Sequence, residues 1–185
     1  MKKQTKILLA SGIGLLIIIF LARKPIVKTI KNKLNDQDKK AFIQKILPIA
    51  QSIGNNIGVP PLFIVAQLCL ESGYGNSVLA AKYNNFGGIK AIPGKAKINL
   101  PTTEVINGKL QKVNRDFAWF NTAEEGLNYQ AKIYSNKYFK KYLNKTKEPL
   151  VYAKLLQSGD IKYATSLNYV KNIEGALNKV KELLT

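Results

Sequence analysis

Residues 61–75 read PLFIVAQLCLESGYG, and they predict a buried helix followed by an abrupt break. Proline is tolerated in the first turn of a helix, so the apolar residues after Pro61 can form one that runs to Glu71. The Ser-Gly-Tyr-Gly that follows predicts its end, because glycine is a poor helix former. The stretch therefore places a single carboxylate at the end of an apolar helix.

Further helices are predicted on both sides of this stretch. Apolar residues recur at helical spacing from Phe42 to Ile53, with Pro48 as an expected kink. Downstream, a capping-box pattern at 122–125 predicts a helix to about Ser135. Other helices are expected over 77–83, 149–157 and 168–184, the last with an apolar face.

The middle of the chain has a different pattern. β-Branched and aromatic residues flank Asn107-Gly108, a dipeptide typical of two-residue hairpin turns. We therefore expect strands near 102–106 and 110–120. The fold class is α+β, mainly α: a helical lobe with a small β-hairpin lobe, and a ligand groove between them.

Composition narrows the chemistry. The chain has no histidine, which excludes Ser-His-Asp and Cys-His nucleophile systems in their usual form and His-ligated zinc sites. Its one cysteine, Cys69, lies among apolar residues and is expected in the core. Carboxylates are thus the leading candidates for acid–base work, and no metal or cofactor is expected. The net charge of +18 favours a polyanionic partner, although a solvated lysine-rich surface would account for it equally well.

Glu71 differs from most of the other ten acidic residues because it follows an apolar segment rather than a polar one. Apolar walls and the negative end of a helix dipole both raise the pKa of a carboxylic acid, as a general acid requires. A solvent-facing glutamate at a helix end is the alternative.

The N-terminus predicts a membrane anchor. Ile7–Ala22 carries no charge and spans about 24 Å as a helix at roughly 1.5 Å per residue. A cleaved signal peptide is the alternative, but small residues at a cleavage site are lacking. We expect an anchor at 1–22, a basic linker at 23–37 and a catalytic domain at 38–185. The flanking positive charges are nearly balanced and leave the orientation open.

The segment AQLCLESGYGNSVLAAKYNNFGGIKA at 66–91 resembles the core motif of the family 73 glycoside hydrolases, the N-acetylglucosaminidases of bacterial autolysins and flagellar lysins. The resemblance continues in TTEV at 102–105, FAWFNTAEEGLNYQ at 117–130 and YATSLNYVKNI at 163–173. It covers about residues 38–185. It implies a lysozyme-like helical lobe with a small β-hairpin lobe.

The resemblance also implies roles for single residues. Glu71 matches the catalytic acid, Glu104 the second acidic residue, and Tyr163 a tyrosine that orients the substrate N-acetyl group. The implied substrate-binding residues are Gln67, Tyr74, Asn85, Phe86 and Tyr169. Trp119 and Tyr74 are also candidates for stacking on sugar rings, with core packing as the alternative, favoured for Trp119.

The implied activity is cleavage of N-acetylglucosaminyl-β-1,4-N-acetylmuramic acid bonds in peptidoglycan strands. Retaining, inverting and substrate-assisted mechanisms stay open, since the sequence does not give the carboxylate separation. Three departures from the family pattern concern the sugar subsites: the earlier position of Phe86, Ala118 in place of arginine, and Ser166 in place of aspartate.

Two other functions compete with this hypothesis. One is a lytic transglycosylase or muramidase of the same superfamily, and the other is a membrane-anchored peptidoglycan-binding protein without activity. Specific nucleic-acid binding is not expected, because the lysines form no aromatic–basic recognition motif. The expected location is a bacterial envelope or the membrane of a membrane-containing phage, with the catalytic domain facing the cell wall.

Overall fold

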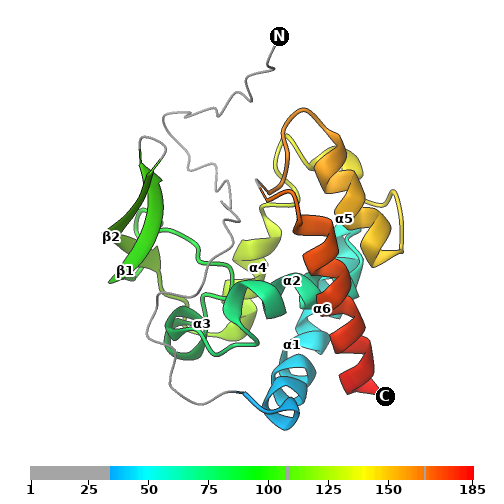
Figure 1. Cartoon of the computed structure of the whole chain (residues 1–185), viewed down its shortest axis with the longest axis horizontal. Helices are drawn as coiled ribbons and strands as arrows, with labels where there is room; N and C mark the ends of the chain where they lie inside the picture. Colours follow the sequence, from blue (N-terminus) through cyan, green and yellow to red (C-terminus); the bar gives the residue numbers. More distant parts are fainter. Residues whose placement is uncertain (1–33, 107–108, 165) are drawn as a thin grey trace.

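The computed structural model describes residues 34–106, 109–164 and 166–185 (Figure 1). The predicted anchor at 7–22 and the linker up to residue 33 lie outside the described residues. Within the described ranges, none of the helices has the length and apolar character needed to span a bilayer.

The first helix, α1 (Asp36–Ile57), begins at a capping box. The Asn35 side chain accepts a hydrogen bond from the Asp38 amide at 2.8 Å, and the Asp38 carboxylate accepts one from the Asn35 amide. The helix continues through the exposed Pro48 and ends at Gly58, whose φ of 77° is the left-handed conformation that favours glycine. Its buried side chains include Ile43, Ile46, Ala50 and Ile53.

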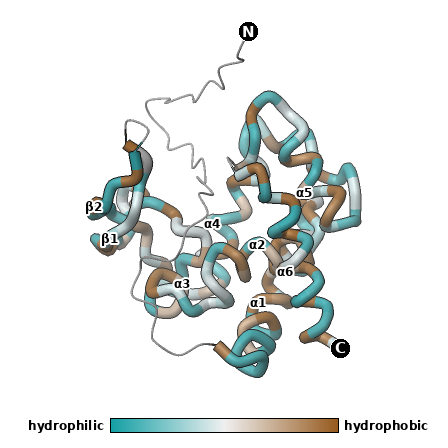
Figure 2. Tube along the Cα trace, viewed as in Figure 1, coloured by the Kyte–Doolittle hydropathy of each residue, from teal (hydrophilic) through white to brown (hydrophobic). Residues whose placement is uncertain are grey.

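Helix α2 (Pro61–Ser72) is the centre of the helical lobe. Residues 63–69 are all buried, and the helix packs against α1, α5 (Pro149–Ser158) and α6 (Tyr169–Leu184). Figure 2 shows hydrophobic and hydrophilic residues alternating around α6, as expected for a helix with one buried face. The predicted helices of this lobe are confirmed, and a short 3₁₀ turn at Lys140–Tyr142 adds to them.

The hairpin lobe consists of β1 (Lys97–Ile106) and β2 (Lys109–Ala118), paired antiparallel from Lys97↔Ala118 to Ile106↔Lys109. The predicted hairpin is confirmed, but β1 begins five residues before its predicted start at 102, because residues 97–101 pair with 114–118. The predicted turn at 107–108 lies outside the described residues. Figure 1 shows the hairpin standing beside the helical lobe, with both strands bent.

Two shorter helices connect the lobes. Helix α3 (Val78–Tyr83) begins at Ser77, and α4 (Ala123–Ala131) begins at Thr122, whose hydroxyl accepts from the Glu125 amide at 3.1 Å. Helix α4 ends four residues earlier than the predicted Ser135, because the chain continues in turns after Ala131. A small second core of Ile89, Ala118 and Phe120 lies where the hairpin joins these helices.

Candidate active site

Glu71 lies in the last turn of α2, where the main chain is tightly fixed. The Ser72 hydroxyl donates to the Leu68 carbonyl oxygen and accepts from the Gly75 amide at 2.8 Å. Gly73 has a φ of 59° and closes the helix, as the sequence predicted. The glutamate is half-buried, so the helix presents its carboxylate at the margin of the core.

A cluster of buried tyrosines lies beside this helix end. Gln67, one turn before Glu71, is fully buried and joins two of them: its amide nitrogen donates to the Tyr163 hydroxyl, and its amide oxygen accepts from the Tyr134 hydroxyl. The rings of Tyr134 and Tyr163 stack with centroids 6.0 Å apart, and Tyr169 lies 5.6 Å from Tyr163. The structure therefore brings together four predicted site residues: Gln67, Glu71, Tyr163 and Tyr169.

Burial and the Glu71 charge both act on the tyrosines of this cluster. Burial raises the pKa of Tyr169 well above its usual value, and the neighbouring Tyr163 and the Glu71 carboxylate raise it further. Burial likewise raises the pKa of Tyr163, with the Glu71 charge acting in the same direction. Both hydroxyls consequently stay neutral at physiological pH and can act as hydrogen-bond donors.

Glu104 occupies a different setting, on β1 of the hairpin. Its carboxylate oxygen Oε1 lies 2.6 Å from Nζ of Lys90, and its side chain is only 18% exposed. The Lys90 ammonium lies 4.3 Å from the centre of the Phe117 ring, within cation–π range. The second predicted acid is thus held by a cation from the segment that precedes the hairpin.

Tyr74 and Asn85, two of the predicted binding residues, are engaged with the protein. Tyr74 has a φ of 55°, packs partly against the helical core and lies 5.8 Å below the Lys39 ammonium. Burial raises the pKa of the Tyr74 hydroxyl to about 12, and the nearby Cys69 also raises it. The Asn85 side chain is buried and hydrogen-bonds to the main chain of Ile89 and Ala118, which fixes the hairpin base.

Phe86 is also buried, and its ring lies 5.9 Å from that of Phe42. The core packing that the sequence favoured for Trp119 is wrong, because the side chain is partly exposed. It is 44% exposed and makes an edge-to-face contact with Tyr83 at 5.4 Å, so an aromatic surface is open to solvent there. As substrate contacts, all of these residues stay predictions.

Sequence reasoning missed two residues of this region. Tyr134 is fully buried beside Tyr163, but it follows α4 in a stretch without a recognisable motif. Lys90 belongs to the quoted Gly-Ile-Lys segment, yet nothing local shows that its partner lies fourteen residues later in the chain. A register for the hairpin would not have revealed that pairing either, because it depends on the curvature of the strands.

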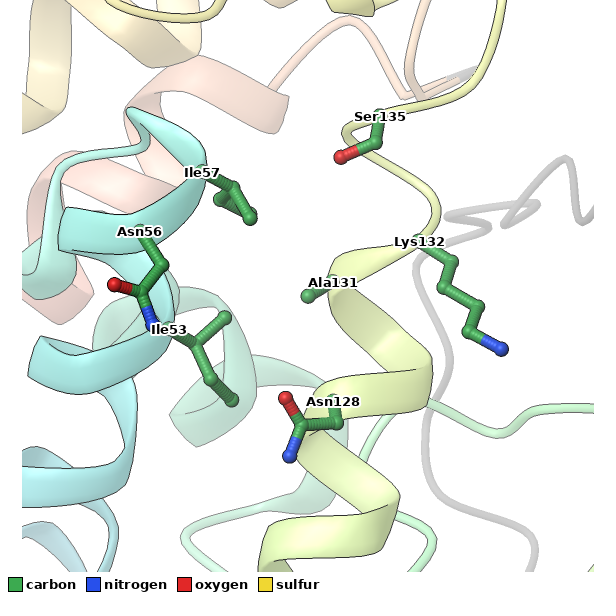
Figure 3. A pocket seen from close by; sticks show the side chains of 7 residues that line it. All are labelled: Ile53, Asn56, Ile57, Asn128, Ala131, Lys132 and Ser135. Atoms are coloured by element: carbon green, nitrogen blue, oxygen red, sulfur yellow. The ribbon is translucent and has the colours of Figure 1, made fainter.

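One pocket, of about 360 Å³, lies elsewhere, between α1 and the end of α4 (Figure 3). Its lining residues are Ile53, Asn56, Ile57, Asn128, Ala131, Lys132 and Ser135. None of the predicted site residues is among them. The substrate groove expected between the lobes therefore stays a prediction.

Helices packed around a buried central helix, with a small antiparallel hairpin beside them, match a lysozyme-like fold. The sequence model of the family described as mannosyl-glycoprotein endo-beta-N-acetylglucosaminidase matches residues 47–182. The chain belongs to this glucosaminidase family of glycoside hydrolases.

Known proteins agree with this assignment. The chain is 28% identical over 178 residues to the exo-glucosaminidase LytG of Bacillus subtilis, covering 93% of this chain and 62% of LytG. It is 29% identical over 139 residues to the peptidoglycan hydrolase FlgJ of Pseudomonas aeruginosa, covering 71% of this chain and 34% of FlgJ. The chain thus spans less than two thirds of these relatives.

Solved structures show the same fold. The catalytic domain of the autolysin Auto from Listeria monocytogenes superposes with a TM-score of 0.70 at 22% identity, covering 83% of this chain and 90% of that domain. A peptidoglycan hydrolase mutant from Sphingomonas sp. A1 gives a TM-score of 0.66 at 26% identity, covering 78% of this chain and 97% of that protein. The mainly helical fold with a small hairpin is thereby confirmed.

Proposed function

We propose that this protein is a peptidoglycan hydrolase that cleaves N-acetylglucosaminyl-β-1,4-N-acetylmuramic acid bonds, with Glu71 as the general acid. One observation carries the proposal: the family match at 47–182 includes both the helix that bears Glu71 in its last turn and the hairpin that bears Glu104. The similarity to an exo-glucosaminidase and to a peptidoglycan hydrolase supports the substrate.

The surroundings of Glu71 suit proton donation to a glycosidic oxygen. The carboxylate is half-buried on a rigid helix end, which limits the positions it can take relative to a bound glycan. Its neighbours Tyr163 and Tyr169 are neutral hydroxyls rather than cations. These two groups therefore do not offer the carboxylate a positive charge that would favour its ionised form.

Glu104 is the proposed second acid. In a retaining or inverting mechanism it would act as nucleophile or as the base that activates water, according to the separation of the two carboxyl groups. In a substrate-assisted mechanism the acetamido oxygen attacks the anomeric carbon, and Glu104 would stabilise positive charge at the sugar. All three assign the leaving-group proton to Glu71.

The decisive experiment compares Glu71→Gln, Glu104→Gln and a matched control, Glu124→Gln, on purified peptidoglycan. Glu124 is an exposed glutamate in the first turn of α4, so its substitution should leave activity unchanged. We expect Glu71→Gln to lose activity by about 10²- to 10⁴-fold, the range for losing a general acid. Full activity in Glu71→Gln would overturn the mechanism.

Mass spectrometry of the products tests the bond. N-Acetylglucosamine at the new reducing end supports the proposal, and product size separates endo from exo cleavage. Anhydro-N-acetylmuramic acid would instead identify a lytic transglycosylase. Binding to sacculi without any cleavage by the unmodified protein would identify a binding protein.

We also propose that residues 7–22 anchor the protein in a membrane, with the catalytic domain facing the cell wall. That membrane belongs either to a bacterial envelope or to a membrane-containing phage. The uncharged run and the net charge of +18, which favours approach to an anionic wall, support this location. Membrane fractionation of the full chain and of a variant lacking residues 1–22 tests it. Equal recovery of both in the membrane fraction would contradict the anchor.

A further inference from the structure

Lys90 lies just before the hairpin, where its main chain forms an isolated β-bridge to β2. The main chain of Lys90 bridges Phe117, and amide–carbonyl hydrogen bonds of 2.9 Å join Ala91 to Asp116 and Ala118 to Ile89. The backbone position of Lys90 is therefore fixed at the base of the hairpin.

Its ion-pair partner lies far along the hairpin. Glu104 pairs with Gln111, six residues before Phe117 on β2. In a flat sheet at about 3.3 Å per residue, those six residues would separate the base and Glu104 by about 20 Å. Extended lysine and glutamate side chains with the ion pair between them span only about 14 Å, given bonds of roughly 1.5 Å.

The 2.6 Å contact between Lys90 and Glu104 can exist only because the hairpin curls toward its base. The bent strands in Figure 1 agree with this curl. The concave face is the one that bears Phe117 and Glu104, the two residues that the Lys90 side chain contacts. Residues directly opposite in an antiparallel pair project from the same side, so this face also carries Ile98, Leu100 and Thr102 of β1 and Gln111, Val113 and Arg115 of β2.

Burial along β1 agrees with this assignment. Thr102 on the concave face is 8% exposed and Ile98 and Leu100 are half-buried, whereas Lys97, Asn99 and Pro101 on the opposite face are exposed. The Lys90 ammonium lies against the Phe117 ring and the Glu104 carboxylate, which are both on the concave face. The Lys90 side chain thus extends along the concave face, from the base of the hairpin to the Glu104 carboxylate.

We infer that Lys90 is a positioning residue that sets the curl of the hairpin, and thereby the position of Glu104 relative to the helical lobe. The inference rests on the proposed function only for its catalytic consequence, since Glu104 matters to the reaction if it is the second acid. The geometric consequence stands by itself: without the Lys90 ammonium, the hairpin opens.

The first experiment measures the curl without activity. Spin labels on cysteines replacing Lys112, exposed on the convex face of β2, and Lys82, exposed on α3, report the distance between the hairpin and the helical lobe by pulsed electron resonance. Cys69 is fully buried and should not react with the label. We expect Lys90→Met to give a longer and broader distance distribution in the full chain.

Matched variants separate this role from a general loss of charge. Lys97→Met removes a similar ion pair on the convex face, Lys97 to Asp116 at 2.6 Å, and should leave the distances unchanged. Lys90→Arg should keep the curl. Glu104→Gln should open it as Lys90→Met does, which provides the same test if Lys90→Met does not fold. Unchanged distances in both of these variants, or an equal shift in Lys97→Met, would overturn the inference.

Kinetics on peptidoglycan then test the catalytic consequence. We expect Lys90→Met to lower kcat by about 10- to 100-fold, as for an ångström-scale misplacement of a catalytic group, with a much smaller change in KM. Lys90→Met combined with Glu104→Gln should be no slower than Glu104→Gln alone. If Glu71→Gln stayed active the proposed function would fail, but the distance measurements would still decide whether Lys90 sets the curl.

Discussion

The substitution Gln67→Met tests the hydrogen-bonded cluster beneath Glu71. Methionine has nearly the length of glutamine but offers neither the amide donor nor the amide acceptor. It therefore removes the hydrogen bond that Gln67 makes to each of the hydroxyls of Tyr134 and Tyr163. All three side chains are at most 3% exposed, so water cannot easily replace the lost bonds.

The expected cost follows from these contacts. Leaving one buried polar group without a partner costs about 1–3 kcal/mol, so two hydroxyls give an upper range of about 2–6 kcal/mol. Because the two rings stack at 6.0 Å, one hydroxyl can turn toward the other and recover part of this cost. We expect the free energy of unfolding to fall by about 2–4 kcal/mol.

Equilibrium urea unfolding of the full chain, followed by far-ultraviolet circular dichroism, measures this loss. Tyr134→Phe is the matched partner variant, because it removes one hydroxyl of the same cluster. In Gln67→Met the Tyr134 hydroxyl has lost its bond to Gln67, and adding Tyr134→Phe removes that hydroxyl. The double variant should therefore be less destabilised than the sum of the two single changes, by about 1–2 kcal/mol. A loss below about 0.5 kcal/mol, or strict additivity, would refute the cluster as described.

Three further predictions concern packing, reactivity and acid stability. Gly126→Ala should destabilise the fold by about 2 kcal/mol or more, since the new Cβ would lie 2.0 Å from a main-chain carbonyl oxygen at the end of α3. Gly175→Ala in α6, where a Cβ would meet no atom of another element within 4 Å, should stabilise the fold by about 0.5–1 kcal/mol. Thermal unfolding compares the two variants. Burial raises the pKa of the Cys69 thiol to about 12, so native protein at pH 8 should resist alkylation that proceeds rapidly in urea, and equal rates would contradict the buried position. Hydrogen bonds from Lys179 and, second, Lys39 lower the pKa of Asp36 from 3.8 to about 2. The contribution of Asp36 to stability is therefore present above about pH 4 and is lost as the pH falls toward 2, so the melting temperature of Asp36→Asn should drop less over this range. A drop as large as in the unmodified protein would show that the contact contributes nothing.

The helical lobe was predictable from the sequence because its signals are local. The apolar run before Glu71 and the glycine after it specify a buried helix and its end within one short stretch. The capping residue Thr122 likewise marked the start of α4. The end of α4 was misplaced, because the turns that follow Ala131 contain no glycine or proline to mark the break.

The hairpin was predictable as a hairpin, but its shape was not. Asn107-Gly108 and the β-branched residues indicated two paired strands, and the register confirms the pairing. Curvature depends on a contact between Lys90 and Glu104, which are fourteen positions apart with a strand between them. A periodicity of two assigns residues to faces but does not say which face is concave.

The same distinction applies to the two acids of the candidate site. The main chain at Glu71 takes its position from the helix that bears it, whose side chains from 63 to 69 are all buried. Glu104 is borne by a two-stranded hairpin, and such a hairpin is marginally stable by itself and needs packing against other elements to keep its shape. Its carboxylate is therefore placed by a side-chain contact rather than by the backbone. Substitutions distant from the chemistry should consequently disturb Glu104 before they disturb Glu71, and Lys90 is the residue through which that disturbance would act.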